Sequence, residues 1–228
     1  MKPLIEVKQL SFSYSKQSPP LFEQVDLEIF PGEVVALLGK SGAGKSTLCH
    51  CLAGIIPHLI KGQISGQVRV DDLLTTDSNP PTLAQRVGVV FQDPDMQLFM
   101  PTVEDELAFG LENLCLPPQE IGERIEQCLQ LVGMSAKRLC HPHQLSGGEK
   151  QRVALAAVLA MNPQALILDE AFSQLDRAGR GALKQIMLQL KDAGKAIVMV
   201  EHDWSNLDIA DRVLVLKERQ LQPFRGEL

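Results

Sequence analysis

Residues 39–46, GKSGAGKS, have the spacing G-x-x-x-x-G-K-[ST] of a phosphate-binding loop. An apolar run precedes the loop and a helical pattern follows it, which is the context that this spacing requires. Backbone N–H groups of the glycines can close around phosphate oxygens, Lys45 can place a charge between the β- and γ-phosphates, and the Ser46 hydroxyl can ligate Mg²⁺. The alternative is a glycine-rich turn that only caps a helix. The residues predicted to bind phosphate are Gly39, Lys40, Ser41, Gly42, Ala43, Gly44, Lys45, Ser46 and Thr47, the last at the α-phosphate.

A second candidate is ALILDE at 165–170, an apolar strand that ends in two acids. A doubly wound fold places its ligand crevice at the carboxyl ends of such strands. Asp169 is therefore predicted to hold Mg²⁺ and its waters, and Glu170 to accept a proton from an attacking water. Without the phosphate loop, a solvated strand end would explain these two acids as well.

A third candidate is LSGGEKQR at 145–152, where a hydroxyl and two glycines precede a predicted helix. A helix N-terminus of this kind is a second anion-binding design. Ser146 and Glu149 have the spacing of a capping box, so we expect the Glu149 side chain to turn back to the Ser146 amide rather than face a ligand. The chain therefore has two predicted phosphate cradles about a hundred residues apart.

The elements that must position these motifs alternate between strands and helices. Residues 4–7 and 25–29 predict a small antiparallel sheet around a turn at 15–20. Residues 93–143 have helical spacing and no convincing strand, which predicts a helical insert. The other expected strands are 33–38, 67–70, 87–91, 165–168, 196–200 and 213–216, and the expected helices are 45–53, 103–114, 118–132, 147–161 and 177–190.

This pattern predicts an α/β fold in a single domain of residues 1–228. We expect residues 1–92 and 144–228 to form a P-loop NTPase core with a parallel sheet. An N-terminal antiparallel β-subdomain belongs to that core, and residues 93–143 form the inserted helical subdomain.

Composition excludes several other classes of protein. The 22 Lys and Arg against 28 Asp and Glu give a net charge of −6, which disfavours a general nucleic-acid binder. Five cysteines without a CxxC pair suit a reducing compartment better than a disulfide framework. We expect neither a signal peptide nor a membrane span, so any membrane role should come from docking.

With these motifs, the chain resembles the nucleotide-binding subunits of ABC transporters over roughly residues 4 to 217. The resemblance extends, in the expected order, to Tyr14, to Gln92 in VVFQD, to Asp176 in SQLD and to His202 in VMVEHD. It implies ATP with Mg²⁺ as the ligand, an ABC ATPase fold and ATP hydrolysis coupled to transmembrane transport.

The resemblance also implies roles for these residues. Tyr14 would stack on adenine, Gln92 would contact Mg²⁺ and the water, and His202 would hold the γ-phosphate and orient the water. The implied catalytic residues are Glu170, His202 and Gln92, and the implied metal-binding residues are Ser46, Gln92 and Asp169.

In this family the LSGGE element serves the ATP bound by a second chain, which would explain the two cradles. Two ATPase subunits, identical or paralogous, would sandwich two nucleotides head to tail. The residues that the resemblance assigns to the opposing chain's site are Ser146, Gly147, Gly148, Glu149 and Asp176.

Residues 91–113, FQDPDMQLFMPTVEDELAFGLEN, resemble the ATPases of energy-coupling-factor importers, which take up vitamins and metal ions. Residues 53–68 resemble the branch linked to thiamine or its precursors. This implies a motor subunit at the cytoplasmic face of the membrane, bound peripherally to integral transport subunits. A soluble ABC ATPase, such as the iron–sulfur assembly type, is the alternative. A chromosome-maintenance clamp would need a long heptad insert, which this sequence does not contain.

The apolar residues Met96, Leu98, Phe99 and Met100 are followed by the acids at 104–106. One interpretation is core packing beside a solvated helix start. The other is a Met-lined groove with an acidic rim that accepts a basic helix of a membrane subunit.

Overall fold

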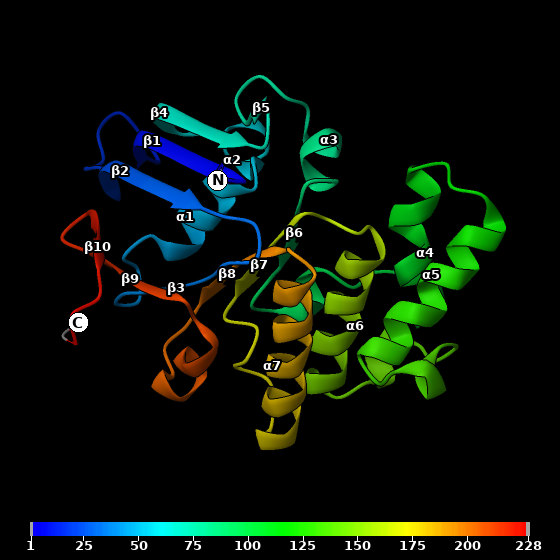
Figure 1. Ribbon diagram of the computed structural model, residues 1–228. Coiled ribbons are helices and arrows are strands. Elements are labelled where there is room, and N and C mark those ends of the chain that lie inside the picture. The colour runs from blue at the N-terminus through cyan, green and yellow to red at the C-terminus, as the bar shows by residue number, and fades with distance from the viewer. Residues whose placement is uncertain (1, 227–228) are drawn as a thin grey trace.

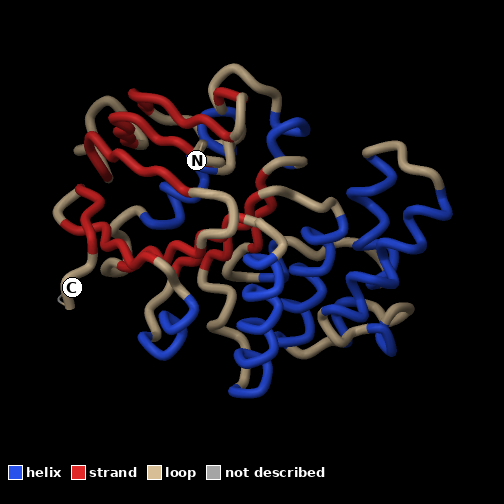
Figure 2. Tube along the Cα trace, in the orientation of Figure 1, coloured by secondary structure: helices blue, strands red, loops and turns tan. Residues whose placement is uncertain are grey.

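The computed structural model describes residues 2–226 and contains two β-sheets with helices. Figures 1 and 2 show the antiparallel sheet and α1 on one side of the larger sheet, and α6 and α7 on the other. This layered arrangement is the predicted α/β fold.

The larger sheet has six strands in the order β10-β9-β3-β8-β7-β6. All neighbouring strands from β9 to β6 pair in parallel, and β10 pairs with β9 antiparallel. The carboxyl ends of the parallel strands therefore lie at one edge, where the predicted site residues follow β3, β6, β7 and β8. Its strands are β3 (Val34–Leu38), β6 (Val87–Val90), β7 (Ala165–Asp169), β8 (Ala196–Val200), β9 (Arg212–Lys217) and β10 (Gln220–Pro223).

The smaller sheet is antiparallel, with the order β2-β1-β4-β5. Its strands are β1 (Ile5–Ser13), β2 (Phe22–Ile29), β4 (Gln63–Val70) and β5 (Leu73–Leu74). The pairing register of β1 shifts on both sides, where Gln9 adopts a positive φ of 51°. This irregularity breaks the apolar alternation, and it explains why the sequence predicted only the first part of β1.

Seven α-helices and four 3₁₀ turns connect the strands within the described residues. The helices are α1 (Lys45–Leu52), α2 (Ile55–His58), α3 (Pro80–Ala84), α4 (Val103–Asn113), α5 (Pro118–Leu131), α6 (Gly147–Ala160) and α7 (Arg177–Asp192). The turns are η1 (Pro94–Met96), η2 (Ser135–Lys137), η3 (Pro142–Gln144) and η4 (Trp204–Ile209). Residues 93–143 contain only helices and turns, as expected.

Two cores lie on opposite faces of the larger sheet. Val34 and Ala36 of β3 belong to one core, whereas Val35 and Leu37 belong to the other. Successive side chains of a strand point to opposite faces, so a strand covered on both sides is apolar throughout. This explains the uninterrupted apolar runs in the sequence. The core that contains Val34 also includes residues of α4, α5, α6 and α7.

The long elements agree with prediction to within a few residues, while short ones were missed. Strand β3 begins at Val34, one residue later than expected, directly after a turn in which the Glu33 side chain accepts a hydrogen bond from the Phe30 amide. Strand β4 begins at Gln63, four residues earlier than expected. Helices α2 and α3 and strands β5 and β10 have at most five residues each, too few to establish a period.

Across residues 2–226, no helix has both the length and the apolar character needed to span a lipid bilayer.

Candidate functional site

The phosphate loop follows β3 directly and leads into α1. Gly39 and Gly44 have φ angles of 150° and 104°, which disfavour other residue types. A Cβ at Gly39 would lie 2.7 Å from the Leu216 carbonyl oxygen, so the backbone packs too closely there for a side chain. These two positions therefore require the glycines that the motif supplies.

The N-terminus of α1 suits an anion. The N-cap residue Gly44 offers no side-chain hydrogen bond, and the first turn contains no acid, so the free N–H groups and the helix dipole face the loop. Lys45 is only 5% exposed, and its Nζ donates to the carbonyls of Gly39 (2.9 Å) and Lys40 (3.1 Å). Burial lowers the pKa of Lys45, while the carboxylates of Glu170 and Asp169 raise it. The loop thus holds a cation away from bulk water, where its attraction to a bound anion is stronger than at the surface.

Asp169 and Ser46 fit a divalent cation. Asp169 is 6% exposed, and its Oδ1 is buried without a hydrogen-bond partner. Burial raises the pKa of Asp169, and a hydrogen bond from Ser46 opposes this shift. An unpartnered buried carboxylate oxygen next to a hydroxyl is a costly arrangement for a protein alone. It is the donor set that Mg²⁺ prefers.

Glu170 joins two of the other predicted residues. Its Oε2 accepts a hydrogen bond from Gln92 Nε2 (2.6 Å), and its Oε1 lies 2.6 Å from His202 Nε2. Glu170 has a φ of 52°, which is uncommon for a residue other than glycine and is typical of functional positions. Its amide donates to the Val200 carbonyl (3.2 Å), which holds this conformation against β8. The ends of β6, β7 and β8 thus bring Gln92, Glu170 and His202 together.

Tyr14 lies beside the phosphate loop. Its hydroxyl is 2.9 Å from Thr47 Oγ1, and its ring packs edge-on against Phe12 with a centroid distance of 5.1 Å. The side chain is 53% exposed. An aromatic face next to a phosphate cradle is therefore open to a ligand.

The LSGGE stretch caps α6 as predicted. Ser146 is the N-cap: its Oγ accepts from the Glu149 amide (3.3 Å), and its own amide donates to Glu149 Oε2 (2.8 Å). The hydrogen bond from the Ser146 amide lowers the pKa of Glu149, so this acid is ionised at neutral pH. The capping box is confirmed, and it turns the carboxylate of Glu149 back onto the helix end.

The same stretch forms one wall of a groove that is separate from the phosphate loop. Asp176, the N-cap of α7, forms part of the other wall, and its Oδ1 accepts from the Gly179 amide (2.7 Å). No residue of the loop at 39–47 lines this groove. The structure therefore groups the predicted residues into two sets, one around Lys45 and Glu170 and one around Ser146 and Asp176.

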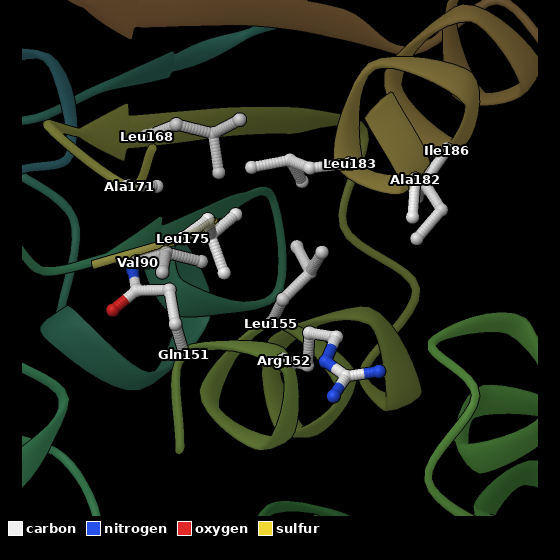
Figure 3. A pocket seen from close by; sticks show the side chains of 10 residues that line it. All are labelled: Val90, Gln151, Arg152, Leu155, Leu168, Ala171, Leu175, Ala182, Leu183 and Ile186. Atoms are coloured by element: carbon white, nitrogen blue, oxygen red, sulfur yellow. The ribbon is translucent and has the colours of Figure 1, made fainter. Parts of the chain in front are cut away.

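Helices α6 and α7 pack on the sheet beneath this groove and leave a small cavity of about 10 Å³ (Figure 3). Figure 3 shows the side chains of Leu155, Leu175 and Leu183 converging on it. A cavity of this size holds at most one water, so it reflects packing and not a ligand site.

Sequence reasoning missed several polar residues that support the site. Gln151 Nε2 donates to the Phe91 carbonyl (3.3 Å), and Lys150 pairs with Asp95 (2.6 Å), so α6 is tied to both sides of Gln92. Glu201 is buried beside His202. An acid directly after an apolar strand was the signal for Asp169, and VMVE at 198–201 carries the same signal for Glu201.

The segment after Gln92 agrees in part with each of the two interpretations, core packing and an exposed apolar groove with an acidic rim. Leu98 is buried in the core, whereas Met96 and Phe99 are 79% and 66% exposed. Glu106 does not belong to an acidic rim. It is buried and accepts hydrogen bonds from the amides of Phe99 (2.9 Å) and Met100 (2.8 Å). This acid satisfies loop amides in the protein interior.

A family model described as ABC transporter matches residues 22–173. This range includes the phosphate loop and Glu170 but ends before Asp176 and His202.

Curated relatives point to the same family. The energy-coupling factor transporter ATP-binding protein EcfA1 of Ligilactobacillus salivarius is 40% identical over 96% of this chain and 76% of that protein. YkoD of Bacillus subtilis, named for ATP binding in HMP/thiamine import, is 44% identical over 87% of this chain and 37% of that protein. An ABC transporter ATP-binding relative from Methanosarcina acetivorans is 44% identical over 93% of this chain and 34% of that protein. The chain thus spans about a third of the length of these last two relatives.

Two solved structures share the fold closely. CbiO1 from Clostridium perfringens, part of the ABC transporter complex cbiONQ, has a TM-score of 0.85 at 33% identity, covering 97% of this chain and 87% of that one. The ATP-binding cassette MJ0796, solved as a dimer in a post-hydrolysis state with ADP and Pi, has a TM-score of 0.84 at 27% identity, covering 98% of this chain and all of that one.

Proposed function

The chain belongs to the ABC transporter family of ATPases, and we propose that it is the ATP-hydrolysing motor subunit of an importer of the energy-coupling-factor type. The observation that carries this proposal is the position of Glu170 between Gln92 and His202, next to Lys45 and Asp169. A carboxylate held by two polar side chains beside a phosphate cradle is arranged for proton transfer at a phosphoryl group.

Each residue has a separate part in the proposed reaction. The loop amides and Lys45 bind the triphosphate, and Tyr14 offers its exposed face to the base. Ser46, Asp169 and Gln92 would hold Mg²⁺, which supplies charge neutralisation at the phosphate oxygens when bound. Gln92 and His202 orient Glu170, which takes the proton from the attacking water, and His202 would also hold the γ-phosphate.

The second cradle completes the site of another subunit in this proposal. Because the groove at Ser146 and Asp176 excludes the chain's own phosphate loop, its helix N-terminus is available to a nucleotide held elsewhere. The capping box holds the Glu149 carboxylate on the Ser146 amide and uses the Glu149 amide, so the amides of Gly147 and Gly148 are the first-turn donors left for an anion. A head-to-tail dimer of ATPase subunits, identical or paralogous, would place two such composite sites between the chains.

An apolar face suits docking of integral membrane subunits. Residues of α2 and its flanks, of α3 and β6, and of the end of α6 line a groove with very little polar surface, including Leu59 and Met161. Helix α4 extends this face, because a Cβ at Gly110 would lie 2.9 Å from Met161 Sδ and the neighbouring Phe109 packs edge-on against exposed Phe99. Exposed apolar patches of this kind mark interaction sites. We propose that the chain binds peripherally at the cytoplasmic face of the membrane through this surface.

The names of two relatives support a proposal for the class of transported solute. EcfA1 is named for an energy-coupling factor transporter and YkoD for HMP/thiamine import. We therefore propose a thiamine-related vitamin, or otherwise a metal ion, as the solute class.

Co-purification from detergent-solubilised native membranes tests the proposal. Tagged wild-type chain should recover integral membrane subunits, identified by mass spectrometry, together with Mg²⁺-dependent ATPase activity. Leu59→Asp should lose the membrane subunits, whereas Leu139→Asp should keep them, because both side chains are exposed (71% and 76%) but only Leu59 lines the groove. Recovery with soluble partners alone would contradict the transporter assignment.

A further inference from the structure

Glu201 is a buried carboxylate next to the site that the proposed reaction does not use. It follows β8 directly, precedes His202 and is 4% exposed. Acids are almost never fully buried unless their oxygens are satisfied, so a function for this one is expected. Its amide donates to the Leu37 carbonyl (3.2 Å), which anchors the residue to the strand that leads into the phosphate loop.

One carboxylate oxygen of Glu201 accepts three hydrogen bonds from the turn that contains His202. Oε2 accepts hydrogen bonds from the His202 amide (3.3 Å), the Asp203 amide (3.4 Å) and Asn206 Nδ2 (3.3 Å). Asn206 is itself 1% exposed and lies in η4. A single oxygen of Glu201 therefore binds the backbone directly after it and the side chain of Asn206, five residues later.

The turn needs such support because the His202 side chain is half-exposed. Its relative exposure is 46%, so little packing holds the imidazole, yet its Nε2 reaches Glu170 Oε1 at 2.6 Å. A side chain with few contacts keeps its place only if its backbone is fixed. Within the described residues, Glu201 is the side chain that accepts a hydrogen bond from the His202 amide.

We propose that Glu201 is a positioning residue that fixes the backbone of His202 so that the imidazole meets Glu170 and the γ-phosphate. This inference rests on the proposed ATPase function and assigns no contact between Glu201 and nucleotide. The required property is a hydrogen-bond acceptor at Oε2, because Oε1 is buried without a partner. A glutamine can supply the same acceptor, whereas a leucine of similar size cannot.

A double-mutant cycle with His202 tests the proposal in the assembled, active ATPase. Glu201→Leu should lower kcat by about 10- to 100-fold, the effect of a misplaced group, with a smaller change in KM for ATP. Glu201→Gln should keep most of the wild-type kcat. In a His202→Ala background, Glu201→Leu should lower kcat only slightly further, because the side chain through which Glu201 acts is already absent.

Glu106 provides the matched control. It is 6% exposed and likewise accepts two backbone amides with one carboxylate oxygen, but it does so in the segment before α4. Any loss of kcat in Glu106→Leu should persist in full when His202→Ala is added. Melting curves identify variants that do not fold, and Asn206→Ala, which removes one donor to Oε2, should then reproduce a weaker form of the same His202-dependent loss.

Fluorescence gives a second readout that general destabilisation does not produce below the melting temperature. Trp204 is the only tryptophan of the chain and lies in the supported turn. Its emission should shift in Glu201→Leu but not in Glu106→Leu. Full additivity of Glu201→Leu with His202→Ala, or a Glu201→Gln variant as impaired as Glu201→Leu, would overturn the proposal. Normal turnover in His202→Ala alone would instead overturn the role of His202 in the proposed function.

Discussion

At the scale of single residues, the backbone conformation of Glu170 decides which way its carboxylate points. Because its φ is 52°, the residue departs from the direction of β7 and faces Gln92 and His202. Such conformations cost free energy and persist where the surroundings enforce them. The hydrogen bond to Val200 and the two side-chain contacts are the surroundings that do so.

We expect Glu170→Gln to bind ATP but to lose about 10²- to 10⁴-fold in turnover, since an amide cannot accept the proton. Binding should survive because the Lys45 ammonium is held in the loop by the carbonyls of Gly39 and Lys40 and not by a hydrogen bond to Glu170. Equilibrium nucleotide binding and steady-state ATPase assays on one preparation measure both effects. A near-normal rate would show that Glu170 is not the base.

The pH dependence of stability tests the burial of Glu201. Burial raises its pKa above 4.5, against opposing hydrogen bonds from Asn206, Asp203 and His202. The folded state therefore binds the proton more tightly than the unfolded state, and the stability contributed below pH 4.5 is lost as pH rises through the folded pKa. Glutamine does not titrate.

Glu201→Gln should therefore melt at a higher temperature than the wild type at pH 7 to 8, by a margin that shrinks as pH falls towards about 4, near the pKa of an unfolded glutamate. Thermal melts across this range provide the comparison. A difference in melting temperature that does not change with pH would mean that Glu201 binds its proton equally tightly in the folded and unfolded states.

At the scale of elements, length and periodicity determine what the sequence predicts. Strands β3, β7 and β8 are buried on both faces, so their apolar runs were clear, as were the glycine after β3 and the acids at the end of β7. Elements that depend on tertiary contacts were not predictable from the sequence, as the irregular β1 and the short α2 illustrate. At the site, the motif residues could be predicted, but the hydrogen bonds of Glu201 and Gln151 could not, because their partners become neighbours only when strands and helices pack together.

The N-cap of α6 has two functions that one substitution can separate. As a cap, Ser146→Ala should cost about 1 kcal/mol of stability. As a phosphate ligand, Ser146 should be needed for most of the ATPase activity at temperatures where the variant remains folded. Thr102, the N-cap of α4, accepts from the Asp105 amide (3.1 Å) and has no predicted ligand, so Thr102→Ala is the control.

Melting and turnover should be measured on the same preparations of these two variants. Similar losses of stability with a loss of activity only in Ser146→Ala support a ligand role. If activity in Ser146→Ala falls only near its melting temperature, the residue is a cap and nothing more.

The 3₁₀ turn after His202 contains a natural reporter of nucleotide state. Trp204 is 52% exposed and packs edge-on against Phe224, with ring centroids 5.0 Å apart. Because the ring is not buried, closure of a dimer near His202 should change its environment. In a Glu170→Gln background, we expect Mg-ATP but not Mg-ADP to shift the emission. Identical spectra with both nucleotides would show that the turn does not respond to closure.

At the scale of the whole molecule, the two anion-binding designs lie in different parts of the fold. The phosphate loop joins β3 to α1, whereas the LSGGE stretch opens α6 on a groove that includes Asp176 and none of residues 39–47. In the proposed head-to-tail dimer, each chain therefore contributes its phosphate loop to one composite site and its LSGGE stretch to the other. Composite sites predict a specific form of complementation between two inactive chains.

Lys45→Ala should prevent a chain from holding nucleotide, and Ser146→Arg should block the site across the interface with a bulky charged side chain. In a dimer of one Lys45→Ala chain and one Ser146→Arg chain, both substitutions fall in the same composite site. The other site combines an intact phosphate loop with an intact LSGGE stretch. Mixing the two inactive proteins on their membrane partner should therefore restore part of the ATPase activity, whereas sites contained within single chains would restore none.

Two controls make this result decisive. Wild-type chain in the same assembly must be active, because a natural dimer of paralogues would leave homodimers inactive from the start. A dimer that carries both substitutions on one chain beside a wild-type chain leaves no undamaged composite site, but one undamaged site if each chain acts alone. Activity in that dimer without recovery in the mixed dimer would contradict shared sites. Inactivity in both would mean that turnover requires two intact sites, because one damaged site then stops the other.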